Sequence, residues 1–218
     1  ETGSAATSSD LSLRALPALP PGLAMQIPAL SAILPFLLLM MVSVRLPLVN
    51  PSPVFGLALL MVVLLLGLTK SFKMDWLPAV ALACVLALEH TWHFQHFQPE
   101  QAALPLGWYL LFFAVFAAFP FLFNQLFRER IVPWAVAALS GPLHFFLMHR
   151  LVKTAYPNEV MGLLPAAFVL PMLLGLVFII RKIPGDRSAR NDLLAWFGGA
   201  TLFFITLIFP IQFDKQWI

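Results

Sequence analysis

Long hydrophobic stretches separated by short polar connectors fill the chain from Ile27 to Phe213, and this pattern constrains the fold more than any other feature. A helix needs about 20 mostly apolar residues to cross a hydrocarbon core roughly 30 Å thick. Hydrophobic residues make up 61% of the chain and charged residues 11%, whereas a soluble domain carries about 25% charged residues. These few charges cannot cover a water-exposed surface. The sequence therefore predicts an integral membrane protein whose main partner is the lipid bilayer.

Seven stretches are long enough to be considered as spans, and each is expected to be an α-helix because backbone polar groups must pair within hydrocarbon. The predicted fold is an all-α, polytopic transmembrane helix bundle. The second stretch is short, so a re-entrant hairpin with the third is the alternative to a full span. The seven predicted spans are Ile27–Val44, Val54–Thr69, Trp76–Phe97, Ala103–Phe123, Ile131–His149, Val160–Ile180 and Leu193–Phe213.

Residues 1–26 are polar and then rich in proline and leucine, which predicts a disordered or interfacial lead-in before a transmembrane domain over residues 27–218. They lack the basic, apolar and cleavage regions of a signal peptide. Helix-capping residue types precede three spans, and Asp75, Asn158 and Asp192 are predicted to cap them. The polar end at Asp214–Ile218 resembles the entry to another helix, so we expect a fragment of a longer protein.

Basic residues fall unequally on the two sides of the predicted bundle. Under the positive-inside rule the richer side, which includes the N-terminus, is cytoplasmic. The net charge of +3 is then explained by topology, and nucleic acid is not an expected partner. The richer side holds Arg14, Lys70, Lys73, Arg128, Arg130, Arg181, Lys182, Arg187 and Arg190, and the other holds Arg45, Arg150, Lys153 and Lys215.

The most unusual chemistry lies at the end of the third span, where a glutamate and three histidines occur between Glu89 and His96. At about 100° per residue, Glu89, His93 and His96 share one helical face. The other two histidines, His144 and His149, are placed by the same topology in the outer half of the fifth span. All five histidines therefore gather toward the outer leaflet. Glu89, His93, His96, His144 and His149 form the candidate polar site.

Three interpretations of this cluster stay open. Histidines at a membrane interface can be structural, and a helix ending near Leu88 would leave them in a loop. Alternatively, ionisable residues inside a membrane serve in proton relays or contact substrates. Two imidazoles and a carboxylate can also bind a divalent metal, which makes Glu89, His93 and His96 weak candidate ligands. No catalytic residue or cofactor is identified, and the single cysteine, Cys84, excludes a cysteine metal cluster.

Three function classes are compatible with these features. Prolines within the spans, at Pro35, Pro142, Pro165 and Pro171, are typical of ordinary packing kinks, and the alternative is kinked helices that line a cavity. Transport or the handling of a lipid or small-molecule ligand in such a cavity is the first class. No charged residue falls clearly at the midpoint of a span, which argues against an ion-coupled transporter. A membrane-embedded enzyme with a His/Glu site at the outer leaflet is the second class, and a structural or assembly protein is the third.

The last third of the chain carries a resemblance. The segments Leu193–Ala200, Phe203–Pro210 and Phe213–Ile218 resemble part of a family of large, many-span bacterial inner-membrane proteins with no assigned function. The match is specific over Asn191–Ile218 and compositional before it. It implies a bacterial inner-membrane location and further spans after Ile218, and it implies no activity or catalytic residues.

Overall fold

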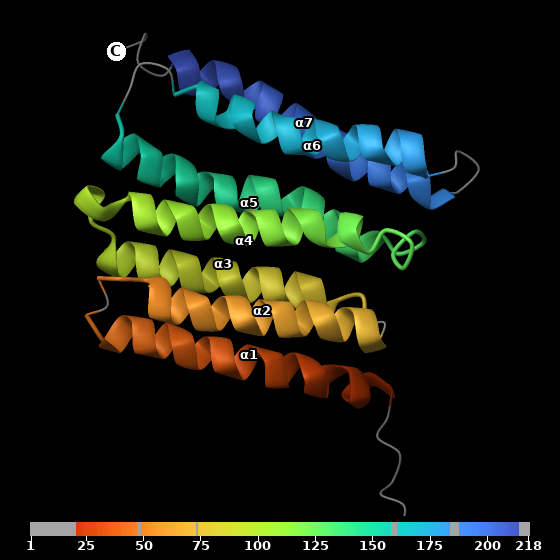
Figure 1. Ribbon diagram of the computed structural model, residues 1–218, viewed down its shortest axis with the longest axis horizontal. Helices are drawn as coiled ribbons and strands as arrows, with labels where there is room; N and C mark the ends of the chain where they lie inside the picture. The colour runs from red at the N-terminus through yellow and green to blue at the C-terminus, as the bar shows by residue number, and fades with distance from the viewer. Residues whose placement is uncertain (1–20, 48, 73, 158–160, 184–187, 214–218) are drawn as a thin grey trace, which may run out of the picture.

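The computed structural model describes residues 21–47, 49–72, 74–157, 161–183 and 188–213. Within these residues the chain is all-helical and contains no strand (Figure 1). The helical bundle predicted from the sequence is therefore confirmed. The elements are α1 (Pro21–Arg45), α2 (Ser52–Phe72), α3 (Leu77–His96), a 3₁₀ turn η1 (Pro99–Gln101), α4 (Ala103–Leu122), α5 (Ile131–Ala155), α6 (Leu163–Lys182) and α7 (Ser188–Phe213).

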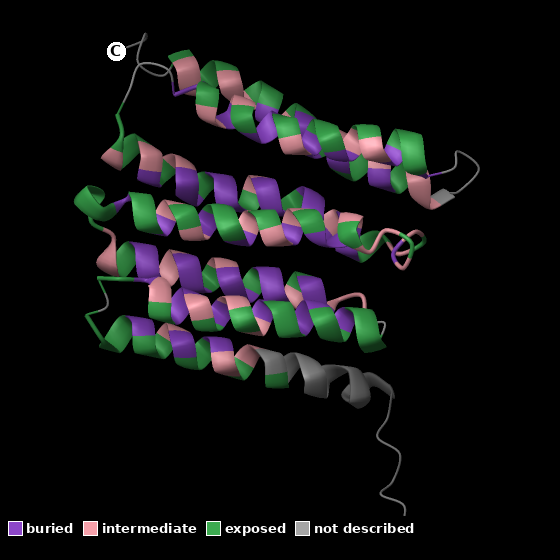
Figure 2. Cartoon of the chain, in the orientation of Figure 1, coloured by how far each residue is buried: buried purple, intermediate pink, exposed green. Residues whose placement is uncertain are grey.

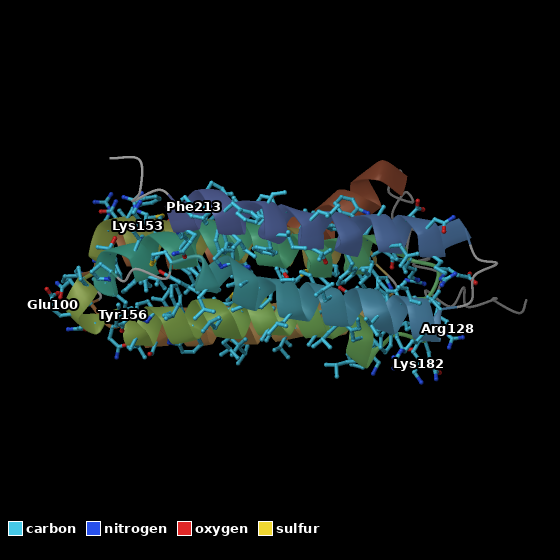
Figure 3. All side chains as sticks on the ribbon, turned by 90° about the horizontal axis from the view of Figure 1, so that it is seen from above. Glu100, Arg128, Lys153, Tyr156, Lys182 and Phe213 are labelled. Atoms are coloured by element: carbon cyan, nitrogen blue, oxygen red, sulfur yellow. The ribbon has the colours of Figure 1, made fainter. Side chains whose placement is uncertain are left out.

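The helices run up and down in chain order and form two layers. The odd-numbered helices α1, α3, α5 and α7 pack side by side in one layer. The even-numbered helices α2, α4 and α6 lie in the other, and each packs on the odd-numbered helix that follows it (Figures 1 and 3). Short connectors explain this order, because they join neighbouring antiparallel helices. The arrangement places α3 and α5 side by side in the middle of the odd layer.

Six helices in the described part of the chain, α2 to α7, are long and apolar enough to cross a membrane. The described helices carry both buried and exposed residues (Figure 2), and many of the exposed residues are large and hydrophobic. The short second stretch belongs to a continuous helix of 21 residues, which at 1.5 Å per residue is about 31 Å long. This length fits a full span and not a re-entrant hairpin. The chain is a multi-pass membrane protein.

Several predicted helix ends are wrong. α1 begins at Pro21, before the predicted start at Ile27, and α5 continues past His149 to Ala155. α7 begins at Ser188, so Asp192 lies inside the helix and does not cap it. For α5 and α7 the reason is the same. Hydropathy marks the part of a helix that lipid covers, whereas backbone hydrogen bonding continues into polar residues beyond it. Asn158 lies outside the described residues.

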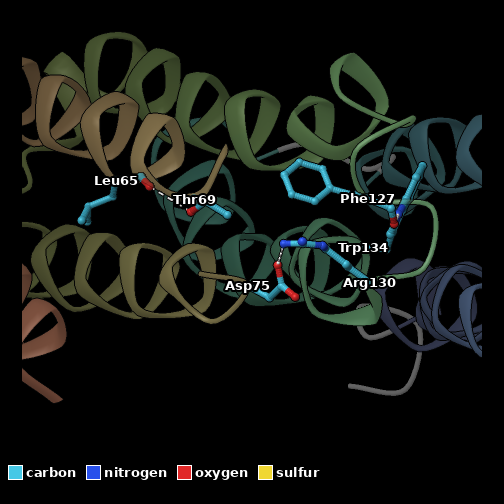
Figure 4. A network of polar contacts seen from close by, with 6 residues as sticks. All are labelled: Leu65, Thr69, Asp75, Phe127, Arg130 and Trp134. Carbon is cyan, nitrogen blue, oxygen red and sulfur yellow. Dashed lines mark hydrogen bonds and ion pairs between the residues drawn. The ribbon is translucent and has the colours of Figure 1, made fainter. Parts of the chain in front are cut away.

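The predicted cap by Asp75 is also wrong, because α3 has no side-chain cap. The Asp75 carboxylate instead accepts a hydrogen bond from the Arg130 guanidinium (Figure 4). This ion pair joins the α2–α3 connector to the α4–α5 connector. Nearby, the Trp134 indole N–H donates to the Phe127 carbonyl oxygen at 2.9 Å. These contacts hold together one end of the bundle.

The two ends of the bundle carry different side chains. Arg128 and Lys182 lie at one end, called here the Arg128 end, and Glu100 and Lys153 lie at the opposite end, the Glu100 end (Figure 3). Lys70 is in the last turn of α2, which runs toward the Arg128 end (Figure 1). The described basic residues therefore divide between the ends as the alternating topology predicts.

Candidate functional site

The candidate site begins on α3, which stays helical through His96. Pro78 lies in the first turn, where its missing N–H is not needed, and the chain turns extended at Phe97. The alternative in which the histidines lie in a loop is therefore wrong. Helical continuity places Glu89 and His93 four residues apart on the face turned into the protein. Glu89 is 0% exposed and His93 is 5% exposed.

Glu89 faces His144 across the contact between α3 and α5. Its Oε2 lies 3.5 Å from Nε2 of His144, and both side chains are fully buried. Phe113 and Phe116 of α4 flank the His144 ring, with centroid distances of 6.4 Å and 6.5 Å. Carboxyl and imidazole therefore lie together in the packed interior between α3, α4 and α5. Two residues predicted from the sequence, Glu89 and His144, are brought together.

Both members of the pair lie well inside their helices. Glu89 is twelve residues from Leu77 and seven from His96, which is about 18 Å and 10 Å along the helix axis. His144 is thirteen residues from Ile131 and eleven from Ala155, so it stands near the middle of α5. The predicted fifth span ended at His149, whereas α5 continues to Ala155. Glu89 keeps the position along α3 that the sequence indicated, closer to His96 than to Leu77.

The proton on His144 can be placed from its partners. Its Nδ1 lies 2.7 Å from the Ser140 carbonyl oxygen, and a carbonyl only accepts, so Nδ1 carries a hydrogen. In the neutral ring Nε2 is then a bare acceptor facing Glu89. A protonated carboxyl can donate to it, or the proton can move to Nε2 and give an ion pair. Either way, Glu89 and His144 are matched when they hold one proton between them.

The hydrogen bonding of this pair is incomplete. Neither carboxyl oxygen of Glu89 nor Nε2 of His144 has a hydrogen-bond partner within the described structure. The 3.5 Å contact is longer than a good hydrogen bond, which has heavy atoms about 2.7–3.2 Å apart. Buried polar groups are normally satisfied, and the exceptions concentrate at sites with a chemical role. The pair therefore differs from the apolar residues around it in having polar atoms that are buried without a hydrogen-bond partner among the described residues.

A second polar contact lies one turn further along α3. The Tyr109 hydroxyl of α4 is 3.3 Å from Nδ1 of His93, and Tyr109 is fully buried. The His93 ring stacks on Phe97 with centroids 4.5 Å apart. Tyr109 was not among the residues predicted from the sequence. The available signal was its rarity, because the chain has two tyrosines against 21 phenylalanines and a lone hydroxyl in an apolar span needs a partner.

The remaining candidate histidines are not part of the Glu89–His144 contact. His96 Nε2 contacts the Ser43 carbonyl oxygen of α1 at 2.5 Å. His149 is half-buried, and its ring stacks on Phe145 at 5.7 Å. His90, which was not a candidate, contacts its own helix at the Leu86 carbonyl oxygen. These three rings satisfy helix–helix or local contacts, as the structural interpretation expects.

The structure gives no support to metal binding by Glu89, His93 and His96. Over the described residues, no three His, Cys, Asp or Glu side chains gather closely enough to hold a metal ion. Glu89 and His96 have different partners on α5 and α1. The geometry instead fits proton exchange, since α3 carries a carboxyl–imidazole contact and, one turn further on, a phenol–imidazole contact.

Open grooves border the site on the even layer. One groove of about 550 Å³ lies between α4 and α6, and its walls include Phe113, Phe121, Pro171 and Phe178. Phe113 is also the ring beside His144. Phe113 therefore contributes both to the groove and to the surroundings of the buried pair.

The chain matches no protein-family model, no curated protein and no solved structure.

Proposed function

We propose that this protein transports or handles an amphipathic, lipid-like molecule and couples that work to a proton held between Glu89 and His144. The observation that carries the proposal is the fully buried carboxyl–imidazole contact between the two central helices of the odd layer. Ionisable groups are costly inside a membrane protein, and those that persist typically serve proton or substrate pathways.

The number of protons that Glu89 and His144 share determines whether α3 and α5 attract or repel each other at this contact. With one shared proton, the α3 and α5 side chains attract each other. When it leaves, a carboxylate faces the lone pair of neutral His144 Nε2, and the contact becomes repulsive. Loss of the proton therefore favours separation of α3 from α5, and a ligand can shift this equilibrium only by binding the two arrangements unequally.

The cargo class is inferred from the groove between α4 and α6. Its described lining residues are apolar, so it suits an acyl chain or a similarly apolar group. Phe113 connects that groove with His144. A membrane-embedded enzyme fits less well, because Glu89 and His144 are fully buried and offer no surface to a substrate.

We also propose the location and orientation. Lys70, Arg128, Arg181 and Lys182 lie on connectors or helix ends that the alternating topology assigns to one side, and the positive-inside rule places that side in the cytoplasm. A bacterial inner membrane is proposed from the resemblance over Asn191–Ile218. The proposed partners are bilayer lipids and a lipid-like ligand, without nucleic acid.

The test uses the purified chain in liposomes that contain a short-chain phospholipid with a dithionite-sensitive fluorescent headgroup. Dithionite bleaches the outer leaflet, so movement of label between leaflets is read as loss of the protected fraction. We expect the protein to accelerate movement, and a pH gradient to change the rate. Glu89→Gln should abolish the pH effect, and the matched Glu100→Gln change at the Glu100 end should not.

Two results would contradict the proposal. Movement no faster than in protein-free liposomes would exclude a lipid-like cargo of this kind. An unchanged pH effect in Glu89→Gln would exclude Glu89 as the coupling group.

A further inference from the structure

A second groove lies on the other side of α4, between α2 and α4. Its volume is about 570 Å³, within the usual range of about 300–1,000 Å³ for ligand sites. Small side chains at Gly67, Ala114 and Ala118 form part of its wall, and of its ten lining residues Lys70 alone is charged. The groove is therefore apolar except for one cationic side chain, that of Lys70.

The extent of the groove matches one leaflet of a bilayer. Along α2 it runs from Val63 to Lys70, and along α4 from Ala114 to Phe123. These segments are about 10 Å and 13 Å long at 1.5 Å per residue, and half of a hydrocarbon core is roughly 15 Å. Val63 and Ala114 stand near the middle of their helices. The groove thus begins at mid-membrane and ends at the Arg128 end.

The cation stands at the mouth of the groove. Lys70 is exposed and belongs to the last turn of α2. Its Nζ lies 4.4 Å from the centroid of the Phe123 ring, a cation–π contact that holds an ammonium in place. Basic residues at this level of a membrane attract anionic lipid headgroups. The apolar wall and the cation at its end together match a phospholipid, in which the acyl chains are joined to a phosphate through glycerol.

We propose that this groove binds one acyl chain of an anionic phospholipid in the leaflet at the Arg128 end, with the lipid phosphate on Lys70. The site does not involve Glu89 or His144, so it stands independently of the proton-coupled function. A groove between α5 and α7, which includes Gly199 and Ala138, has about 360 Å³ and no charged lining residue. Lipid binding in this second, uncharged groove can be compared with binding in the α2–α4 groove to show what Lys70 contributes.

The experiment is native mass spectrometry of the full chain released from detergent with added phosphatidylglycerol or phosphatidylcholine of identical acyl chains. The wild type should retain one phosphatidylglycerol in preference to phosphatidylcholine. Lys70→Gln should reduce that preference about fivefold, since one lysine near the surface contributes about 1 kcal/mol to anionic lipid binding. Lys70→Arg should keep it.

A second variant fills the groove. A Cβ at Gly67 meets nothing within 4 Å, so Gly67→Leu can be accommodated and should remove retention of both lipids. Gly199→Leu is its control, because Gly199 is equally uncrowded in the α5–α7 groove. Lys182→Gln controls for the loss of any lysine at the Arg128 end. Circular dichroism confirms that each variant keeps its helices.

Four results would overturn the proposal. The first is equal retention of the two lipids by the wild type, and the second is an unchanged preference in Lys70→Gln. The third is loss of that preference in Lys182→Gln to the same extent as in Lys70→Gln. The fourth is lipid retention in Gly67→Leu equal to that in Gly199→Leu.

Discussion

Adding a single methyl group at Gly175 should strain the packing of α6 on α7 and lower the free energy of unfolding. A Cβ built there lies 2.5 Å from Cε1 and 2.6 Å from Cδ1 of Phe197, and 3.1 Å from Cζ of Phe121. Phe197 is 1% exposed, and Trp134 and Phe121 both lie against its ring. The ring therefore has no free direction in which to move.

Gly199→Ala on α7 supplies the reference, because nothing lies within 4 Å of its Cβ position. Both glycines are helical, so each change to alanine gains about 1 kcal/mol of helix propensity. Overpacking at Gly175 costs about 1–3 kcal/mol, whereas Gly199 carries no such cost. The propensity gain cancels in the comparison. The free energy of unfolding of Gly175→Ala should thus be about 1–3 kcal/mol below that of Gly199→Ala.

The assay is thermal unfolding of both variants in the same detergent, followed by tryptophan fluorescence. For a chain of this length the difference corresponds to roughly 2–12 °C in Tm. A Phe197→Leu change combined with Gly175→Ala should recover part of the loss, since leucine leaves room for the methyl group. Equal Tm values for Gly175→Ala and Gly199→Ala would refute the packing argument.

Three further outcomes are expected. Tyr109→Phe removes the hydroxyl that contacts His93 at 3.3 Å, so the free energy of unfolding measured in detergent should fall by about 1 kcal/mol; no change would show that the contact adds nothing. A double-mutant cycle of Asp75→Asn and Arg130→Gln should give a coupling below about 1 kcal/mol that shrinks with added salt, since both side chains are part-exposed; a larger, salt-independent coupling would contradict this. In a Cys84→Ala background, single cysteines in the Arg128–Arg130 and Arg181–Arg190 connectors should resist impermeant thiol reagents in intact cells, and ready labelling of both would reject the cytoplasmic assignment.

The number and order of the helices could be predicted because lipid requires a long apolar stretch for each span. Their ends could not be predicted in the same way. Ser188–Asp192 and Arg150–Ala155 are helical although they are polar, since backbone hydrogen bonds form equally well outside lipid. The predicted end at His149 placed His144 nearer the end of its helix than it lies in α5.

The candidate site was partly predictable for a related reason. Helical periodicity alone placed Glu89 and His93 on one face of α3. Which helix faces them depends on the two-layer packing, and hydropathy carries no information about that. His144 and Tyr109 could therefore be identified as partners only in three dimensions. The same limit explains why His96, on the predicted face, pairs instead with the Ser43 carbonyl of α1.

Exchange of a proton between Glu89 and His144 can be observed by infrared difference spectroscopy of the purified protein after a pH step. A protonated carboxyl group gives a carbonyl stretch that a carboxylate lacks. We expect this band in the wild type and in Glu100→Gln, its absence in Glu89→Gln, and an altered pH dependence in His144→Ala. Difference spectra with the same carboxyl band in Glu89→Gln and wild type would contradict it.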